Sequence, residues 1–146
     1  MHREGHVGFT LTIASLIMWL VHRWDLLTLA IALGFATFPD VDLKLGIQHR
    51  KWTHNVFFGL FSGLTFGYIT ELSGLGFEPG FLGAFGGIIL HILGDLFTYR
   101  SFAPFYPISK RKFAIGLFRS DNRLVNRLML IIGLITFCAL YYSEHF

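Results

Sequence analysis

Residues 81–98 read FLGAFGGIILHILGDLFT, a run that is almost wholly apolar and long enough to cross the hydrocarbon core of a membrane. Its two ionisable residues, His91 and Asp95, are four positions apart and therefore share one face of a helix. A charged side chain within a membrane segment is costly and is functional by default. The run therefore predicts a membrane helix that carries part of a functional site.

Four further apolar stretches cover residues 7–21, 26–38, 55–72 and 124–142. Hydrophobic residues make up 53% of the chain and charged residues 14%, which is outside the range of soluble domains. We predict one all-α domain over residues 1–146, an integral membrane bundle of about five helices. The first two stretches are short: we expect them to cross a thinned bilayer, and a hairpin that only dips into it is the alternative.

The basic residues predict the orientation of this bundle. Apart from Arg23, every Lys and Arg lies in the N-terminal segment, in the loops at 39–53 and 99–123, or at Arg127 in the first turn of the last helix. The positive-inside rule places these segments in the cytoplasm. We therefore expect a multi-pass protein of the inner or plasma membrane with a cytoplasmic N-terminus.

Glycines recur every four residues on two of the expected helices. They are Gly59, Gly63 and Gly67 on the third helix, with Gly83 and Gly87 on the fourth. Small residues at this spacing let helix backbones approach closely in a membrane. The pattern predicts tight helix packing rather than a binding site.

Seven side chains that can bind a metal fall at the predicted cytoplasmic ends of these stretches, and we expect them to converge. They are His6, Asp40, Asp42, His49, His54, His91 and Asp95. Mixed nitrogen and carboxylate ligands suit zinc, which we favour, or manganese or iron, and so many ligands indicate two or more ions. We predict that Asp40, His54, His91 and Asp95 are the core ligands. The others would bind a second ion or surround it.

Two neighbouring metal ions are a common device for hydrolysing phosphate esters. We therefore predict a hydrolase in which a metal-activated hydroxide attacks a phosphoester. Asp42, Arg50 and Thr53 are the catalytic candidates; either Asp42 or the metal-bound hydroxide is the general base, and Thr53 is also a candidate cap for the third helix.

Basic and amide side chains near the predicted site could bind the substrate. They are Arg50, Lys51, Arg119, Asn122, Arg123 and Asn126, and the segment 120–122 looks like a helix start. A membrane lipid is favoured as the phosphate-containing substrate, because the site lies at headgroup level and the loop at 104–118 mixes aromatic with basic residues. Nucleic acid is not expected as the main partner.

Several short motifs carry a resemblance to a known family. They are Glu4-Gly5-His6, Phe38-Pro39-Asp40-Val41-Asp42, His49-Arg50-x-x-Thr53-His54-Asn55, the run from Leu90 to Thr98, and Pro104-x-x-Pro107. In this order, from residue 4 to about residue 123, the chain resembles the YdjM-type membrane-bound metal-dependent hydrolases. That bacterial family includes an inner-membrane protein described as LexA-binding. The resemblance implies a membrane hydrolase.

The chain departs from the family pattern in its short loop between Asp42 and His49, and in having Asn126 where an acidic residue is expected. It is similar, more distantly, to zinc-dependent phospholipase C and P1-type nucleases, through the interval from Asp40 to His54 and the later His-x-x-x-Asp. That similarity would favour phosphodiester substrates.

Three other classes of protein compete with a hydrolase. A metal transporter normally binds its ion near the middle of the membrane on broken helices, whereas the ligands here gather at one interface. A membrane scaffold could bind a cytoplasmic protein through the aromatic and basic segment 102–119. A di-iron oxygenase would need paired histidine boxes, and the chain has no His-His pair.

Overall fold

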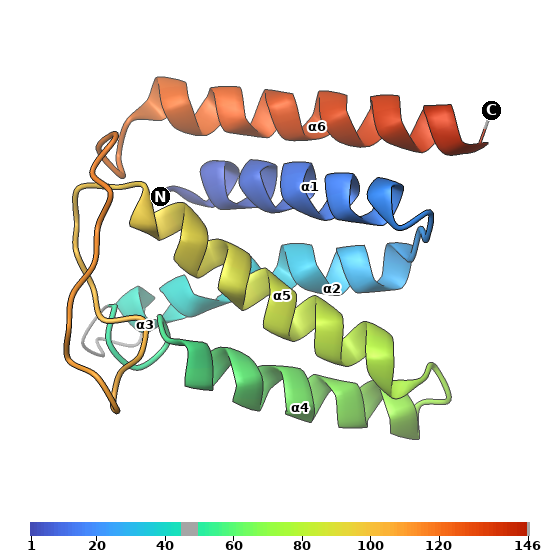
Figure 1. The fold of residues 1–146 in the computed structure, drawn as a ribbon, viewed down its shortest axis with the longest axis horizontal. Coiled ribbons are helices and arrows are strands. Elements are labelled where there is room, and N and C mark those ends of the chain that lie inside the picture. Colours follow the sequence, from blue (N-terminus) through green and yellow to red (C-terminus); the bar gives the residue numbers. More distant parts are fainter. Residues whose placement is uncertain (45–49, 146) are drawn as a thin grey trace.

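The computed structural model describes residues 1–44 and 50–145 (Figure 1). Its regular elements are all helices, as predicted. Its elements are α1 (Arg3–Leu20), α2 (Leu26–Phe35), the 3-10 helix η1 (Phe38–Asp40), α3 (Val41–Lys44), α4 (Val56–Leu72), α5 (Phe77–Leu96) and α6 (Arg123–His145). The described residues form no β-strand and only two isolated β-bridges. The five main helices, α1, α2, α4, α5 and α6, correspond to the five apolar stretches.

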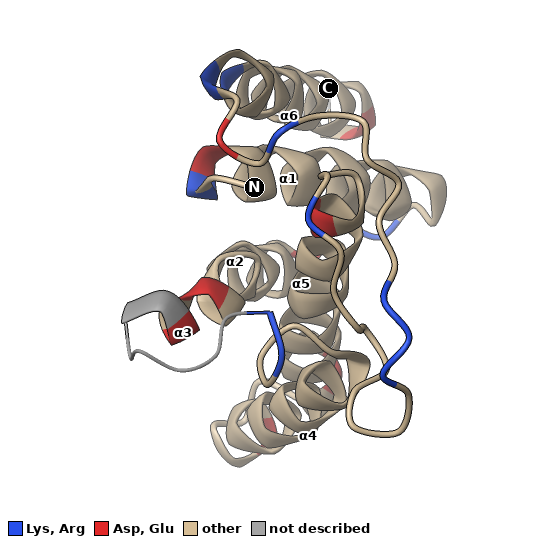
Figure 2. Cartoon of the chain, turned by 90° about the vertical axis from the view of Figure 1, so that its left-hand side faces the viewer, with Lys and Arg blue, Asp and Glu red and all other residues tan. Residues whose placement is uncertain are grey.

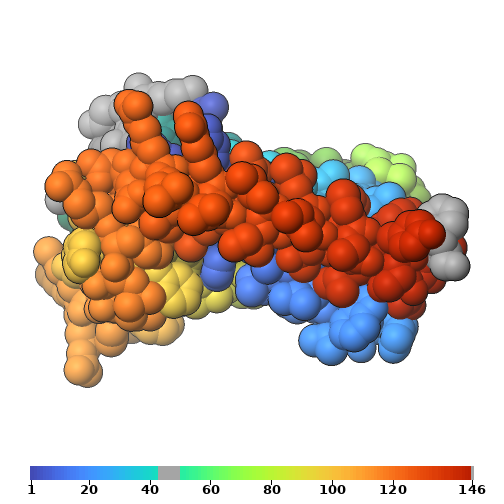
Figure 3. All heavy atoms as spheres, turned by 90° about the horizontal axis from the view of Figure 1, so that it is seen from above, coloured from blue at the N-terminus to red at the C-terminus, as the bar shows by residue number. Residues whose placement is uncertain are grey.

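Successive main helices run in opposite directions along the bundle (Figure 1). The N-terminus, the segment between α2 and α4 and the segment between α5 and α6 therefore lie at one end, which we call the site end. The loops at 21–25 and 73–76 lie at the other end. Helix α5 is central, since α1, α2 and α4 all pack against it. Among the described helices α6 packs only against α1, and it lies along the outside of the molecule (Figure 3).

The glycines spaced four apart lie where helices approach most closely, which confirms the packing prediction. On α4, Gly63 faces α5, and a Cβ added there would lie 2.8 Å from the Cβ of Phe85. On α5, Gly87 faces α2, and an added Cβ would lie 2.8 Å from the Cβ of Phe35. Side chains of the neighbouring helix would lie 2.6 Å from an added Cβ at Gly67, 2.7 Å at Gly83 and 3.2 Å at Gly59.

Replacing Gly133 with alanine is expected to destabilise the protein, because Gly133 of α6 lies directly against Gly8 of α1. An added Cβ would lie 2.9 Å from the Cα of Gly8, and backbone cannot move aside as a flexible side chain can. We expect a loss of about 1–3 kcal/mol. The measurement is thermal unfolding of the purified protein in detergent.

Gly34→Ala is the matched control, because nothing lies within 4 Å of the position its Cβ would take in α2. It should leave stability unchanged or raise it by up to about 1 kcal/mol through helix propensity. Equal melting temperatures for the two variants would contradict the close contact between α1 and α6.

The ends of several helices differ from the sequence-based expectation. Helix α5 begins at Phe77 rather than at residue 81. Helix α2 ends at Phe35, and the 3-10 helix η1, which contains Pro39, follows it. The prediction that Thr53 caps α4 is wrong. The cap is Asn55, whose side chain accepts a hydrogen bond of 2.8 Å from the Phe58 amide. The helix start expected at residues 120–122 is confirmed, since α6 begins at Arg123.

Two described helices, α5 and α6, are long and apolar enough to cross a membrane. Helix α4 is apolar but has only 17 residues. Helix α2 has 10 residues and a length of about 15 Å, half of the roughly 30 Å hydrocarbon core, so it cannot cross as a helix on its own. By length and composition, two of the five main helices meet the requirement, and the second stretch fails because it breaks before Pro39.

Candidate metal centre

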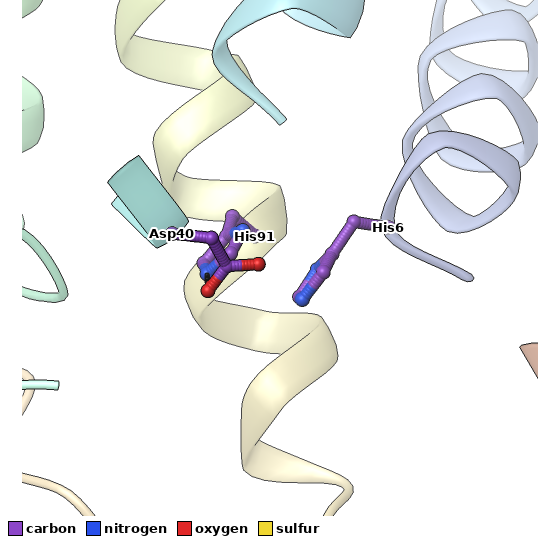
Figure 4. Close-up of side chains that lie close together, drawn as sticks. All are labelled: His6, Asp40 and His91. Atoms are coloured by element: carbon purple, nitrogen blue, oxygen red, sulfur yellow. Dashed lines mark ion pairs between the residues drawn. The ribbon is translucent and has the colours of Figure 1, made fainter. Parts of the chain in front are cut away.

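Five of the predicted ligands converge at the site end from four segments of the chain. They are His6 of α1, Asp40 of η1, His54 just before α4, and His91 and Asp95 of α5, and we call them the His/Asp cluster. Figure 4 shows three of them, with the side chains of His6, Asp40 and His91 directed toward one another. All are buried except Asp40, whose side chain is 19% exposed. Of the other two predicted ligands, Asp42 lies behind His54, on the side of its Nδ1, and His49 lies outside the described residues.

The His91 ring is fixed by a backbone contact. Its Nδ1 lies 2.8 Å from the carbonyl oxygen of Ala36, so Nδ1 carries the proton and donates it to that oxygen. This tautomer leaves a lone pair on Nε2, which is buried and has no hydrogen-bond partner among the described residues. Histidines that bind metals are oriented in this way, with the second nitrogen held by a carbonyl or a carboxylate.

His54, like His91, has its Nδ1 fixed by a hydrogen bond, here through a relay of side chains. The Thr53 hydroxyl donates to Asp42 Oδ2 at 2.8 Å, which leaves its oxygen to accept from His54 Nδ1 at 2.9 Å. The relay directs His54 Nε2 into the cluster, toward Asp40 and Asp95. The fully buried Asp42 therefore acts on the site through Thr53 and His54.

The spacing of the donor atoms fits a shared cation. His54 Nε2 lies 3.5 Å from Asp40 Oδ1 and 3.7 Å from Asp95 Oδ2, and His91 Nε2 lies 3.8 and 3.9 Å from the same oxygens. These separations are too long for good hydrogen bonds. Two ligands that each lie about 2.1 Å from one ion are roughly 3–4 Å apart. The residues therefore fit a divalent transition metal.

Two ligand sets can be drawn, and they share one residue. His54, His91 and Asp95 form one set, and His6, Asp40 and His91 form the other. Because Nδ1 of His91 is engaged by Ala36, only the single lone pair of Nε2 remains, and it can bind one ion at a time. The number of ions stays a prediction.

His6 lies beside His91 rather than opposite it. The two rings are stacked, with centroids 3.8 Å apart and an interplanar angle of 11°. Gly94 makes room for Met1 beside these rings, since a Cβ there would lie 2.6 Å from Met1 Cε, whereas its 3.4 Å separation from His6 Nδ1 would be an ordinary contact. His6 Nε2 is 3.4 Å from Asp95 Oδ1 and 3.0 Å from the amino group of Met1, which also donates to Asp95.

Arg50 provides positive charge next to the cluster. Its Nη2 lies 3.0 Å from Asp95 Oδ2, and its Nη1 donates to the carbonyl oxygen of Arg100 at 2.7 Å. Its backbone amide donates to Asp42 Oδ2 at 3.2 Å, and its side chain is only 9% exposed. Arg50 was predicted to bind substrate or take part in catalysis; in the structure its guanidinium pairs with Asp95.

Asp40 is the carboxylate of the cluster that meets solvent. Burial raises its pKa, but the His54 imidazole, together with His91 and His6, outweighs that effect and the pKa is lowered to about 2. Asp40 is therefore ionised at neutral pH, which is the form that binds a cation.

The remaining predicted substrate residues lie outside the cluster. Figure 2 shows Lys and Arg spread over the loops and helix ends of the site end. Lys51 lines a basic pocket beside Arg50, Arg119 pairs with Asp121 at 3.2 Å, and Arg123 lines a shallow pocket with Arg3 and Arg127.

The two asparagines have structural partners. Asn122 accepts from the Val125 amide at 3.2 Å and so caps α6. The fully buried Asn126 accepts from the His2 amide at 3.0 Å and donates to the carbonyl oxygens of Ser120 and Asn122, which fixes the start of α6 against the N-terminal segment.

Four features of the site were not predicted. Three of them, Gly94, Thr98 and Phe102, lie in or just after the run that carries His91: Thr98 donates to the Asp95 carbonyl at 2.8 Å, and Phe102, 2% exposed, packs edge-on against His54. A Gly and a Thr next to candidate ligands were a usable signal. The fourth, the Ala36 carbonyl, is main chain and has no signal in the sequence.

The comparisons with known proteins bear on the family of the chain. No curated protein and no solved structure matches the chain. The family model of the YdjM inner membrane protein matches residues 1–145. Because the match covers nearly all of a chain whose α5 and α6 are long and apolar enough to cross a membrane, this protein belongs to the YdjM inner membrane protein family.

Proposed function

We propose that the protein is a membrane-bound, metal-dependent hydrolase that cleaves a phosphoester at the cytoplasmic face of the membrane. The observation that carries the proposal is the orientation of His91. Its Nδ1 is held by Ala36, and its buried Nε2 faces Asp40 and Asp95 at distances suited to a shared ion. A buried lone pair that accepts no hydrogen bond is costly, and a cation bound at His91 Nε2 would satisfy it.

In this proposal Asp40, His54, His91 and Asp95 hold a divalent transition metal, with zinc the ion best matched to mixed His and Asp ligands. His6, and His49 outside the described residues, are proposed for a second ion. When bound, the metal would supply the Lewis acidity that activates water and stabilises the charge of a phosphoryl group.

The residues around the ligands have separate roles. Asp42 and Thr53 keep the His54 lone pair directed into the cluster. Arg50 offsets part of the negative charge of Asp95. Asp40, the cluster residue most open to solvent, is the carboxylate that incoming water or substrate would meet first, and its lowered pKa suits an anionic ligand rather than a proton acceptor.

The proposed orientation rests on the distribution of charge. Arg23, the one basic residue at the far end, pairs with Glu78 at 2.8 Å, and the other Lys and Arg residues of the described chain lie at the site end. Single cysteines at Ser101 and at Ser73, in a Cys138→Ser background, would test it in sealed inner-membrane vesicles of known sidedness. The residue 101 variant should be labelled only from the cytoplasmic side, and the opposite result would reverse the orientation.

The direct test of function uses purified protein in detergent. Elemental analysis should find a transition metal, and a panel of phosphomonoesters, phosphodiesters and phospholipids assayed with Zn, Mn and Mg should reveal hydrolysis. Chelation should abolish that activity, and the metal found by analysis should restore it. A protein without transition metal, or hydrolysis that survives chelation, would overturn the proposal. A metal-loaded protein inactive on the whole panel would favour a transporter or scaffold.

A further inference from the structure

A basic pocket of about 400 Å³ opens beside Arg50 at the site end of the bundle. Three lysines line it, Lys51, Lys110 and Lys112, together with the rings of Phe102 and Tyr106. The Lys51 ammonium lies 5.2 Å from the centre of the Tyr106 ring, which holds its charge at the pocket wall. Concave sites lined by cations suit phosphate groups.

An apolar pocket of about 490 Å³ adjoins the basic one. Residues of two helices and the following loop line it, among them Val56 of α4, Ile89 and Leu93 of α5, and Phe105 and Ala114. Lys112 lines both pockets.

The wall between the two pockets is ordered by backbone hydrogen bonds. Phe102 and Phe113 exchange amide-to-carbonyl hydrogen bonds of 2.9 and 3.2 Å. Phe102 lines the basic pocket and Phe113 the apolar one, so this isolated bridge fixes their relative position.

The depths of the two pockets match the layout of a phospholipid. From Ile89 to Leu96 the apolar pocket follows about 10 Å of α5, a helix long enough to cross the membrane, and ends where that helix reaches the site end. Lys110 and Lys112 lie beyond that point, in the loop that follows α5, and Lys51 lies in the segment before α4. A lipid places its phosphate at the interface and its acyl chains toward the membrane centre, which is the same order.

We propose that the two pockets form one binding site for an anionic phospholipid, with its phosphate among Lys51, Lys110 and Lys112 and one acyl chain against Ile89 and Leu93. This inference rests on the proposed function, because it identifies the class of substrate that the metal centre acts on. Arg50 connects the lipid site with the metal centre, since it lines the basic pocket and pairs with Asp95 of the His/Asp cluster.

The test uses photoreactive lipids and needs no enzymatic turnover. The full-length protein is placed in phosphatidylcholine nanodiscs that contain a small fraction of phosphatidylglycerol with a diazirine on one acyl chain. After illumination, mass spectrometry should locate the adducts on Ile89, Leu93 and Phe105. Photoreactive phosphatidylcholine with the same chain should label these positions much less, because its headgroup has no net charge for the lysines to attract.

Matched variants separate this site from general attraction to the membrane. Lys112→Ala should lower labelling by phosphatidylglycerol about fivefold, the effect expected of one cation at a membrane surface. Arg111→Ala removes a neighbouring charge that lines neither pocket and should change labelling less than twofold. Ala114→Trp should block the apolar pocket from its exposed edge, whereas Ile108→Trp, at a residue that is 80% exposed, should not.

Several outcomes would overturn the inference. They are equal labelling by the two lipids, equal loss in the Lys112 and Arg111 variants, and adducts spread along the exposed face of α6. Displacement of the lipid by inorganic phosphate or glycerol phosphate alone would show a site for soluble phosphate instead. Labelling should persist with a chelator, and Lys112→Ala should keep its metal, so failure of lipid binding can be distinguished from failure of the metal centre.

Discussion

Replacing His91 with alanine is expected to remove the bound transition metal. The substitution deletes the one imidazole nitrogen common to both ligand sets, and no other side chain can replace it at a position that is fully buried. Loss of a partner that only supports a metal ligand already lowers affinity about 10–100-fold, so loss of the ligand itself should exceed that range. The measurement is elemental analysis of the purified variant, with titration by a chelator of known affinity.

The control for this prediction is His22→Ala. His22 is also a histidine, but its side chain is 74% exposed at the far end of the bundle, where it pairs with Glu144. This variant should keep the full metal content. Because His91→Ala also leaves the Ala36 carbonyl without its donor, circular dichroism should establish that the variant is folded, and His91→Asn provides a second, polar replacement. A folded His91 variant with unchanged metal content would show that the cluster is not a metal site.

Replacing Thr53 with valine is expected to lower metal affinity about 10–100-fold. Valine has the same shape but cannot pass a hydrogen bond from His54 Nδ1 to Asp42, so the proton and the orientation of the His54 ring are no longer fixed. The helix itself should be unaffected, since Asn55 rather than Thr53 caps α4. Competition with a chromophoric chelator measures the affinity.

Thr65→Val, on the helix α4 that follows Thr53, is the matched control. The Thr65 hydroxyl bonds only to the Phe61 carbonyl on the exposed side of α4, so its removal should leave metal affinity unchanged. Thr53→Ser keeps a hydroxyl and should restore most of the affinity lost in Thr53→Val. If serine and valine behaved alike at residue 53, the relay through Asp42 would have no role in binding.

The general arrangement could be read from the sequence because apolar length and charge distribution specify it. Five apolar stretches predicted five main helices, and the polar residues at their ends predicted which loops meet. The four-residue spacing of His91 and Asp95 on an otherwise apolar helix placed them on one face, where the structure has them. Long-range convergence followed from the alternating directions of the helices.

The ends of the helices were harder to predict, for identifiable reasons. Glu78 and Pro79 made residues 77–80 look like a loop, but proline is tolerated in the first turn of a helix, and Glu78 pairs with Arg23 across the far end. At the start of α4, Thr53 and Asn55 are both favourable caps. Only the structure shows that the Thr53 hydroxyl is already engaged by Asp42.

The supporting contacts of the site were least accessible to prediction. Arg50 was expected to meet the substrate because it is basic and lies next to His49, but a sequence cannot show that its guanidinium turns toward Asp95. Asp42 could equally have been a ligand, since the difference between binding a metal and orienting His54 depends on a few ångströms.

The break between α2 and η1 has a consequence for the composition of this stretch. In an uninterrupted helix the Ala36 carbonyl would accept a hydrogen bond from its own helix; here it is released and binds His91, and the same bend brings Asp40 to the cluster. A sequence that continued α2 through this bend would remove both the Ala36 carbonyl and Asp40 from the cluster. Selection for the proposed site should therefore keep residues 26–40 a poor membrane-spanning helix, and the weakness of this segment as an anchor is a requirement of the geometry of the cluster.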